Sequence, residues 1–171
     1  MRGGRHHTVG PEPGQERAIM AGESLRRAAD GLDDEAVTAL LMKTRRIALV
    51  GASARPERPS WGVMRFLLAH GYDVVPVNPG LAGQTLQGRM VVASLAEAAP
   101  LDMVDIFRSL DQVPGVVDEA IRLKARSVWM QLGLLEPGSA ARARAAGLVV
   151  AMDRCPAIEW PRLGLVRDAS P

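Results

Sequence analysis

The chain has little of several residue types that whole classes of protein need. It has one cysteine, Cys155, among 171 residues, so neither an intramolecular disulfide nor a thiolate zinc site nor a dithiol redox pair can form. We expect a reducing, cytoplasmic location for such a chain. No apolar run approaches the length of a membrane span, and the first residues lack the hydrophobic stretch of a secretory signal. We therefore expect no contact with a membrane.

Aromatic side chains are scarce, and neither sign of charge is in large excess. Aromatic residues make up 4% of the chain, and 21 basic residues are nearly balanced by 19 acidic ones. Surfaces that bind nucleic acid usually combine clustered cations with aromatic side chains that stack on bases. Because the arginines are scattered along this sequence, we expect no nucleic-acid partner.

The composition that is present is typical of a folded globular protein, with 47% apolar and 23% charged residues. Residues 1–30 are rich in Gly, Pro and Arg and show little apolar periodicity, which predicts a disordered N-terminal extension, and Met20 is an alternative start. Residues 31–171 are long enough to bury a substantial core. We predict a single domain over that range.

Apolar periodicity predicts strands that alternate with helices. The predicted strands are 47–50, 73–77, 90–92, 103–107, 127–130 and 148–152, and the predicted helices lie at about 33–44, 60–70, 94–98, 113–121 and 136–146. Such alternation predicts right-handed crossovers and a parallel sheet covered by helices on both faces. The expected fold class is α/β: a Rossmann-like, doubly wound parallel sheet in three α/β/α layers. We expect the first helix and the tail at 155–171 to pack at the edges of the sheet.

The most informative stretch is a predicted strand that runs into a turn of small residues and arginines, at 46–60. Gly51 can take backbone angles closed to other residues, and Ala52 and Ser53 add little bulk. A helix that begins near Ser60 would point unpaired N–H groups and a partial positive charge at the turn. This arrangement is typical of an anion site. We predict that residues 51–60 bind phosphate, with main-chain amides as donors, at the carboxyl edge of the sheet.

The residues after the second predicted strand constrain the kind of nucleotide. The fingerprint G-x-G-x-x-G is only partly met, because Ser53 takes the place of its second glycine. A cofactor bound through a free ribose diol usually meets an acid at the end of that strand, where this chain has Asn78 and Pro79. NAD is therefore disfavoured, although an NAD(P)-binding, oxidoreductase-like domain stays an alternative. The motif of P-loop NTPases is absent.

Several motifs together resemble the small bacterial CoA-binding proteins over about residues 40–165. This family is similar in fold to the CoA-binding domain of the succinyl-CoA ligase alpha subunit. The resemblance implies one Rossmann-like domain that binds coenzyme A or an acyl-CoA, with no established reaction. The motifs that carry it are residues 47–53, 58–60, 77–79, 83–88, 105–108, 129–133 and 152–156.

Coenzyme A carries a diphosphate and a ribose 3′-phosphate, so its site needs N–H donors and cations. Arg55, Arg58 and Arg108 are the candidate cations, each on a loop at the expected sheet edge. The resemblance implies contacts with the phosphates, with the adenosine and with the nucleotide or pantetheine arm. The implied phosphate contacts are Gly51, Ala52, Ser53, Arg58 and Ser60. The implied adenosine contacts are Val77, Asn78 and Pro79. Phe107 and Arg108 are implied to contact the nucleotide or the pantetheine arm. Relatives often carry a basic residue after the Asn-Pro pair, where this chain has Gly80 and Leu81.

We expect no catalytic residue and no metal site. A phosphohistidine mechanism like that of the related ligases needs a histidine in an ordered site, whereas His6 and His7 lie in the expected extension and His70 precedes a helix-ending glycine. The expected function is CoA binding without catalysis, and the alternatives are a CoA-dependent ligase-like or a regulatory protein. An isolated cysteine such as Cys155 is usually a small buried hydrophobe, and a mixed disulfide with the CoA thiol is the other interpretation. The sequence leaves open whether the protein forms a homodimer.

Overall fold

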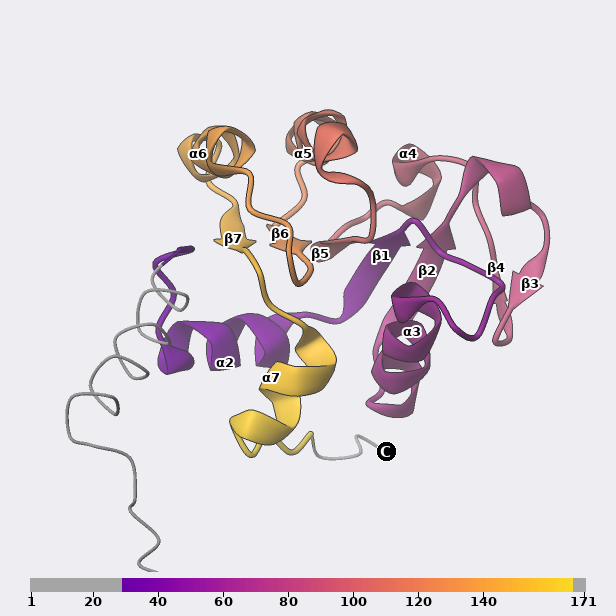
Figure 1. The fold of residues 1–171 in the computed structure, drawn as a ribbon, viewed down its shortest axis with the longest axis horizontal. Coiled ribbons are helices and arrows are strands. Elements are labelled where there is room, and N and C mark those ends of the chain that lie inside the picture. The colour runs from indigo at the N-terminus through magenta and orange to yellow at the C-terminus, as the bar shows by residue number, and fades with distance from the viewer. Residues whose placement is uncertain (1–28, 168–171) are drawn as a thin grey trace, which may run out of the picture.

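The computed structural model describes residues 29–167, so most of the expected N-terminal extension lies outside the described residues. Its centre is a parallel sheet of five strands in the order β2-β1-β5-β6-β7 (Figure 1). The strands are β1 (Arg46–Val50), β2 (Asp73–Val77), β5 (Met103–Ile106), β6 (Ser127–Met130) and β7 (Val149–Ala151). The chain passes from β1 to β2 on one side and then crosses to β5 on the other side of β1. The predicted doubly wound α/β fold is confirmed, and its strand order reverses between β1 and β5.

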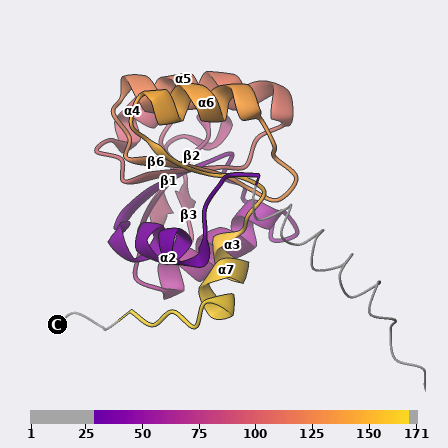
Figure 2. The same cartoon turned by 90° about the vertical axis from the view of Figure 1, so that its left-hand side faces the viewer.

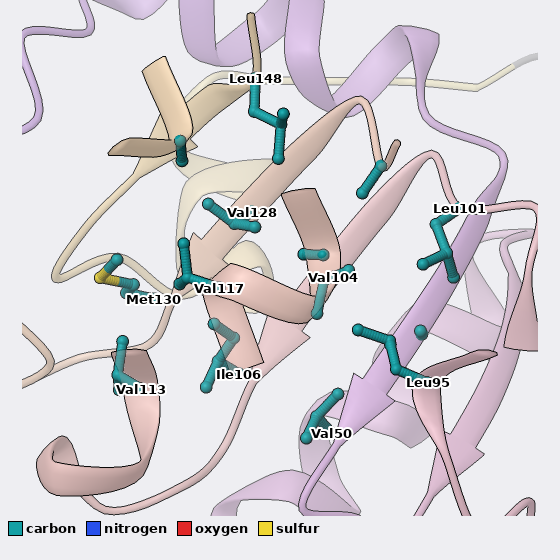
Figure 3. Packing of buried hydrophobic residues seen from close by; sticks show 14 of the residues in the cluster. Val50, Leu95, Leu101, Val104, Ile106, Val113, Val117, Val128, Met130 and Leu148 are labelled. Carbon is teal, nitrogen blue, oxygen red and sulfur yellow. The ribbon is translucent and has the colours of Figure 1, made fainter. Parts of the chain in front are cut away.

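Helices cover both faces of the sheet (Figure 2). One face carries α4 (Leu95–Ala98), α5 (Val113–Arg122) and α6 (Pro137–Ala145), and the other carries α2 (Asp34–Lys43), α3 (Pro59–Ala69) and α7 (Pro156–Arg162). Each face has its own apolar cluster, and Figure 3 shows the one beneath α5, where Val117 packs over Val104 and Val128. The three predicted layers are confirmed.

The strands alternate between these two clusters. In β1, Ile47 and Leu49 face α2 and α3, while Ala48 and Val50 face the opposite helix layer. Both sets are buried because side chains of a strand point alternately to its two faces and both faces are covered. This explains the continuous apolar run that marked the strand in the sequence.

Two predicted placements are wrong. The first helix, α2, and the tail helix, α7, were expected at the edges of the sheet, but Val37 of α2 and Trp160 of α7 belong to the same apolar cluster as Leu49. Both helices therefore lie on the face that carries α3, and α7 lies between α2 and α3 (Figures 1 and 2). The physical reason is burial: a helix with an apolar stripe covers far more of it against the face of a sheet than against its edge.

The predicted strand at 90–92 is also corrected. Residues Arg89–Met90 form β4, which pairs antiparallel with β3 (Thr85–Leu86) in a separate two-stranded sheet. The chain folds back there because Gln87 and Gly88 both have positive φ, at 48° and 80°. Only Val92 reaches the main sheet, as a single parallel bridge to Val77.

The beginning of the described chain is fixed to its far end. Asp30 is buried, and its Oδ2 lies 2.6 Å from Nε of Arg154, whose side chain is also buried. The same carboxylate accepts hydrogen bonds from the main-chain N–H groups of Leu32 and Met152. Asp33 then caps α2 by accepting from the N–H of Ala36 at 2.8 Å. Within residues 29–167, no helix is both long and apolar enough to cross a bilayer.

Candidate functional site

A cavity of about 780 Å³ opens at the carboxyl edge of the sheet, where the loops after β1, β2, β5 and β6 converge. It lies beside the point between β1 and β5 where the strand order reverses, the usual ligand position in doubly wound sheets. The loops that carry Arg55, Arg58 and Arg108 therefore meet at this edge of the sheet, where the sequence analysis expected them. Nine of the eleven predicted site residues line this cavity: Gly51, Ala52, Ser53, Arg55, Arg58, Ser60, Asn78, Phe107 and Arg108.

Gly51 permits the closest approach between two of these loops. Its φ is +89°, and a Cβ placed on it would lie 2.1 Å from the carbonyl oxygen of Phe107. Any other residue would clash with that carbonyl and would also be strained by its backbone angle. The N–H of Phe107 in turn donates to the carbonyl of Val50 at 2.8 Å. A glycine is thus required at this position by the packing of the loop that follows β5.

The first two amides of the predicted phosphate loop are already engaged. The N–H groups of Gly51 and Ala52 both point at the carbonyl oxygen of Val77, at N···O distances of 3.1 and 3.4 Å. They continue the pairing of β1 with β2 beyond the end of the strand, so they do not face the cavity as free donors. This corrects the expectation that amides at the very start of the loop hold phosphate. Within the described part of the chain, the N–H groups of Ser53 and Ala54 have no hydrogen-bond partner.

The entrance to α3 adds to the positive character of the loop. Arg58 is the N-cap residue, its side chain makes no capping hydrogen bond, and the first turn of the helix carries no acidic residue. Pro59 begins the helix and the side chain of Ser60 is buried at the cavity wall. The first turn of α3 therefore contains no carboxylate that would neutralise the partial positive charge at this helix end.

Among the residues that the structure describes, three arginines line the cavity and no aspartate or glutamate does. Arg55 and Arg58 are exposed and Arg108 is half-buried. Among residues 29–167, none of the three forms an ion pair, whereas Arg46 and Arg162 are both held by carboxylates. The cavity consequently carries an excess of positive charge, and guanidinium groups suit phosphate oxygens because they donate two hydrogen bonds in one plane.

Asn78 joins the loop after β2 to the loop after β1. Its Nδ2 donates to the carbonyl of Ala52 at 2.8 Å, and its Oδ1 accepts from the N–H of Gly80 at 2.8 Å. The two other residues predicted here do not line the cavity, because Val77 is buried in the apolar cluster beneath α4 and α5 and Pro79 is exposed on the short helix η1 (Pro79–Leu81). Gly80 and Leu81 line the cavity instead.

The end of the cavity near β6 contains residues that the sequence analysis did not select. Gln131, Leu132, Leu134 and Cys155 all contribute to its wall. Gln131 and Leu132 directly follow β6, so the rule that ligands bind at the carboxyl ends of parallel strands pointed to them. Cys155 was expected to be a buried hydrophobe, and it is indeed nearly buried, at 7% exposure, yet it also borders the cavity.

Asp105 lies beneath this end of the cavity. Its side chain is completely buried, its Oδ1 accepts a hydrogen bond from Nε2 of Gln131 at 2.6 Å, and its Oδ2 has no partner among the described residues. Burial raises the pKa of Asp105 to about 7, and the hydrogen bond from Gln131 acts weakly in the opposite direction. The hydrogen bond to Asp105 also fixes the amide of Gln131.

His70, the histidine of the described part, stacks on Phe66 at the end of α3 and does not line the cavity. Within residues 29–167, no group of three or more His, Cys, Asp or Glu side chains is arranged to hold a metal ion.

Comparison with known proteins gives this cavity a family context. Residues 45–161 match the family model described as a CoA binding domain. The chain belongs to this CoA-binding domain family. The resemblance seen in the sequence motifs is thereby confirmed.

Individual proteins and solved structures are also similar to this chain. The uncharacterized protein YneT of Bacillus subtilis is 37% identical over 117 residues, which are 68% of this chain and 85% of the relative. A hypothetical protein from Pyrococcus horikoshii has a similar structure, with a TM-score of 0.73 and 38% identity over 80% of this chain and 95% of that one. A dinucleotide-forming acetyl-coenzyme A synthetase of Candidatus Korarchaeum cryptofilum is 25% identical with a TM-score of 0.58, but the match covers 66% of this chain and only 26% of the synthetase.

Proposed function

We propose that the protein binds coenzyme A or an acyl-CoA in the cavity at the carboxyl edge of the sheet and has no catalytic activity of its own. The observation that carries the proposal is the set of three cavity arginines, Arg55, Arg58 and Arg108, which have neither ion-pair partners among the described residues nor an acid beside them in the wall. A diphosphate is a ligand that would neutralise them. Membership of the CoA-binding domain family supports the same ligand.

The diphosphate would lie over the loop after β1. In this proposal the donors are the N–H groups of Ser53 and Ala54 and the beginning of α3, where Ser60 lines the wall. Gly51 and Ala52 have a different role: their amides hold the loop to the carbonyl of Val77 and so give it its shape.

The two ends of the ligand would point in opposite directions along the sheet edge. The adenosine fits beside Asn78, Gly80 and Leu81 at the end of β2, and the pantetheine arm runs past Phe107 towards Leu132 after β6. Leu81 and Phe107 are partly buried apolar side chains, which suit a nucleoside and an aliphatic arm better than open water does.

The alternative ligand, NAD, finds less support. Its free ribose diol needs a carboxylate at the end of β2, but Asn78 stands there and both ends of its amide are engaged with the main chain. Within residues 29–167, no carboxylate lines the cavity.

Calorimetric titration of the full chain with CoA, acetyl-CoA, NAD and NADP tests the proposal directly. We expect binding of CoA or acetyl-CoA, and binding of NAD without CoA would refute it. Arg58→Ala and Arg108→Ala should each weaken CoA by about 1.5–3 kcal/mol, the range for hydrogen bonds to charged groups, which is roughly 10-fold to 150-fold in Kd. Arg122→Ala removes an exposed arginine of α5 and should leave the Kd unchanged. If all three variants bound CoA like the parent protein, the phosphates would lie elsewhere.

A further inference from the structure

The thiol of Cys155 lies where the reactive end of the proposed ligand would arrive. Cys155 borders the cavity at its β6 end, and the N–H of the preceding residue, Arg154, approaches the carbonyl of Met130 at 3.4 Å. The cysteine is therefore two to three strand spacings from the loop after β1, or roughly 10–14 Å. The pantetheine arm of CoA has about as many main-chain bonds as a four-residue peptide, which extends over roughly 13–14 Å at most. With the diphosphate at Ser53, the arm is long enough to bring the CoA sulfur to Sγ of Cys155.

A second observation points to a ligand at the same place. Oδ2 of Asp105 is completely buried and has no hydrogen-bond partner among residues 29–167, which is rare for a buried polar atom without a functional reason. Asp105 lies in register between Leu49 of β1 and Trp129 of β6, so its side chain points to the face of the sheet on which Cys155 packs. The carboxyl group is near enough for its charge to act on the Cys155 thiol.

The surroundings of Cys155 disfavour reaction with disulfides met by random collision. Burial is the largest influence and raises the pKa of the Cys155 thiol, while main-chain hydrogen bonds from Ala157 and Ile158 partly oppose it. A thiol that is seldom ionised attacks disulfides slowly. A disulfide held in the cavity would instead be presented to the sulfur at a high effective concentration. The position of this thiol thus favours selectivity for a ligand that the cavity binds.

We propose that Cys155 is a site of reversible covalent modification by coenzyme A, formed by exchange with CoA disulfide bound in the cavity. This inference rests on the proposed CoA binding. The Cys155 thiol loses its proton to solvent, and its thiolate attacks the nearer sulfur of the CoA disulfide. The disulfide bond of the reagent breaks as the bond from Sγ to the bound CoA sulfur forms. The second CoA leaves as a thiolate and takes a proton from water, so CoA disulfide is the only oxidant required.

The departing half of the reagent has a route to solvent. Leu132, at the same end of the cavity, is 57% exposed, and Leu135 nearby is 45% exposed. The nucleotide of the leaving CoA can therefore extend into water while the bound half occupies the cavity.

The test treats the reduced full chain with CoA disulfide or, separately, with glutathione disulfide, and follows the intact mass under non-reducing conditions. We expect one CoA moiety per chain, located at Cys155 by peptide mapping and removed by dithiothreitol. The adduct should form at least about tenfold faster with CoA disulfide than with glutathione disulfide, because only the former is held by the cavity. Desulfo-CoA, which has no thiol, should compete with CoA disulfide for the cavity and slow its reaction with Cys155.

Two outcomes would overturn the inference. One is equal rates with both disulfides, which would mark Cys155 as an ordinary accessible thiol. The other is the absence of an adduct under conditions in which calorimetry detects CoA binding, and in that case the proposed function would stand while the modification fails. If calorimetry detected no CoA binding at all, the proposed function itself would fail. Cys155→Ser, or Cys155→Ala if the serine variant does not fold, should form no adduct with either disulfide.

Discussion

The buried carboxyl group of Asp105 should make the protein less stable as the pH rises to neutrality. Its side chain is completely buried, and burial raises its pKa from 3.8 to about 7. In the unfolded chain the same group ionises near pH 4. Between these two pH values the folded protein holds one proton more than the unfolded chain, so the free energy of unfolding falls by about 1.4 kcal/mol for each pH unit. The total loss is on the order of 4 kcal/mol and is complete above about pH 7.

Asp105→Asn should remove this loss. The amide has the same shape, its oxygen can still accept from Nε2 of Gln131, and it does not ionise. We expect the variant and the parent protein to have similar unfolding free energies near pH 4. The variant should be more stable by roughly 2 kcal/mol at about pH 5.5 and by on the order of 4 kcal/mol at pH 8. Urea unfolding followed by tryptophan fluorescence at several pH values measures this difference.

The control is Asp111→Asn, which removes an exposed carboxylate of the short helix η2 (Leu110–Gln112). Its effect on stability should stay within about 0.5 kcal/mol. The reasoning would be refuted if the curves of unfolding free energy against pH for Asp105→Asn and the parent protein ran parallel from pH 4 to 8. It would also be refuted if the asparagine variant were the less stable protein at pH 8.

Two further substitutions test the framework of the site by denaturant unfolding. Gly51→Ala should cost about 3 kcal/mol or more, because it combines a strained backbone angle with a clash against a carbonyl, whereas Gly83→Ala, at a similar φ of +83° with open space around it, should cost only about 1–2 kcal/mol. Arg154→Ala should cost about 3–5 kcal/mol, because it leaves a buried carboxylate unpaired. Arg126→Ala, which breaks an ion pair of an 82% exposed arginine, should cost less than about 1 kcal/mol. The structural argument would be contradicted if Gly51→Ala and Gly83→Ala lowered the free energy of unfolding equally. Equal losses for Arg154→Ala and Arg126→Ala would also contradict it.

The local pattern of the sequence was sufficient for the strands of the main sheet. Each is a short apolar run covered on both faces, and the predicted ranges differ from the observed ones by about one residue at their ends. The segment at 90–92 was wrongly predicted to be a strand of the main sheet because Val91 and Val92 are apolar, like the residues of the true strands. Val92 is the residue that touches the sheet, whereas Met90 is exposed and pairs within a hairpin. Apolar character does not distinguish a strand of the core from a segment that meets it at one point.

The sequence was sufficient to predict which residues lie at the site when their position follows from the order of strands and loops. It was not sufficient to predict which groups form hydrogen bonds there. Gly51, Arg58 and Arg108 lie at the carboxyl ends of strands, and the topology alone brings such positions together. The direction of the amides of Gly51 and Ala52 was not predictable, because it depends on the carbonyl of Val77, which is distant in sequence. The same limit applies to the packing of α2 and α7, since an apolar stripe does not reveal which surface will cover it.

The ion pair between Asp30 and Arg154 delays part of the folding during synthesis of the chain on the ribosome. The two residues are 124 positions apart, so at 5–20 residues per second the aspartate is made on the order of 6–25 s before its partner. During that interval the carboxylate has no cation to accompany it out of water, and the segment that leads into α2 cannot settle into its final place. The segment at Asp30 is therefore among the last parts of the described chain to reach its final position, after the final strand has been translated.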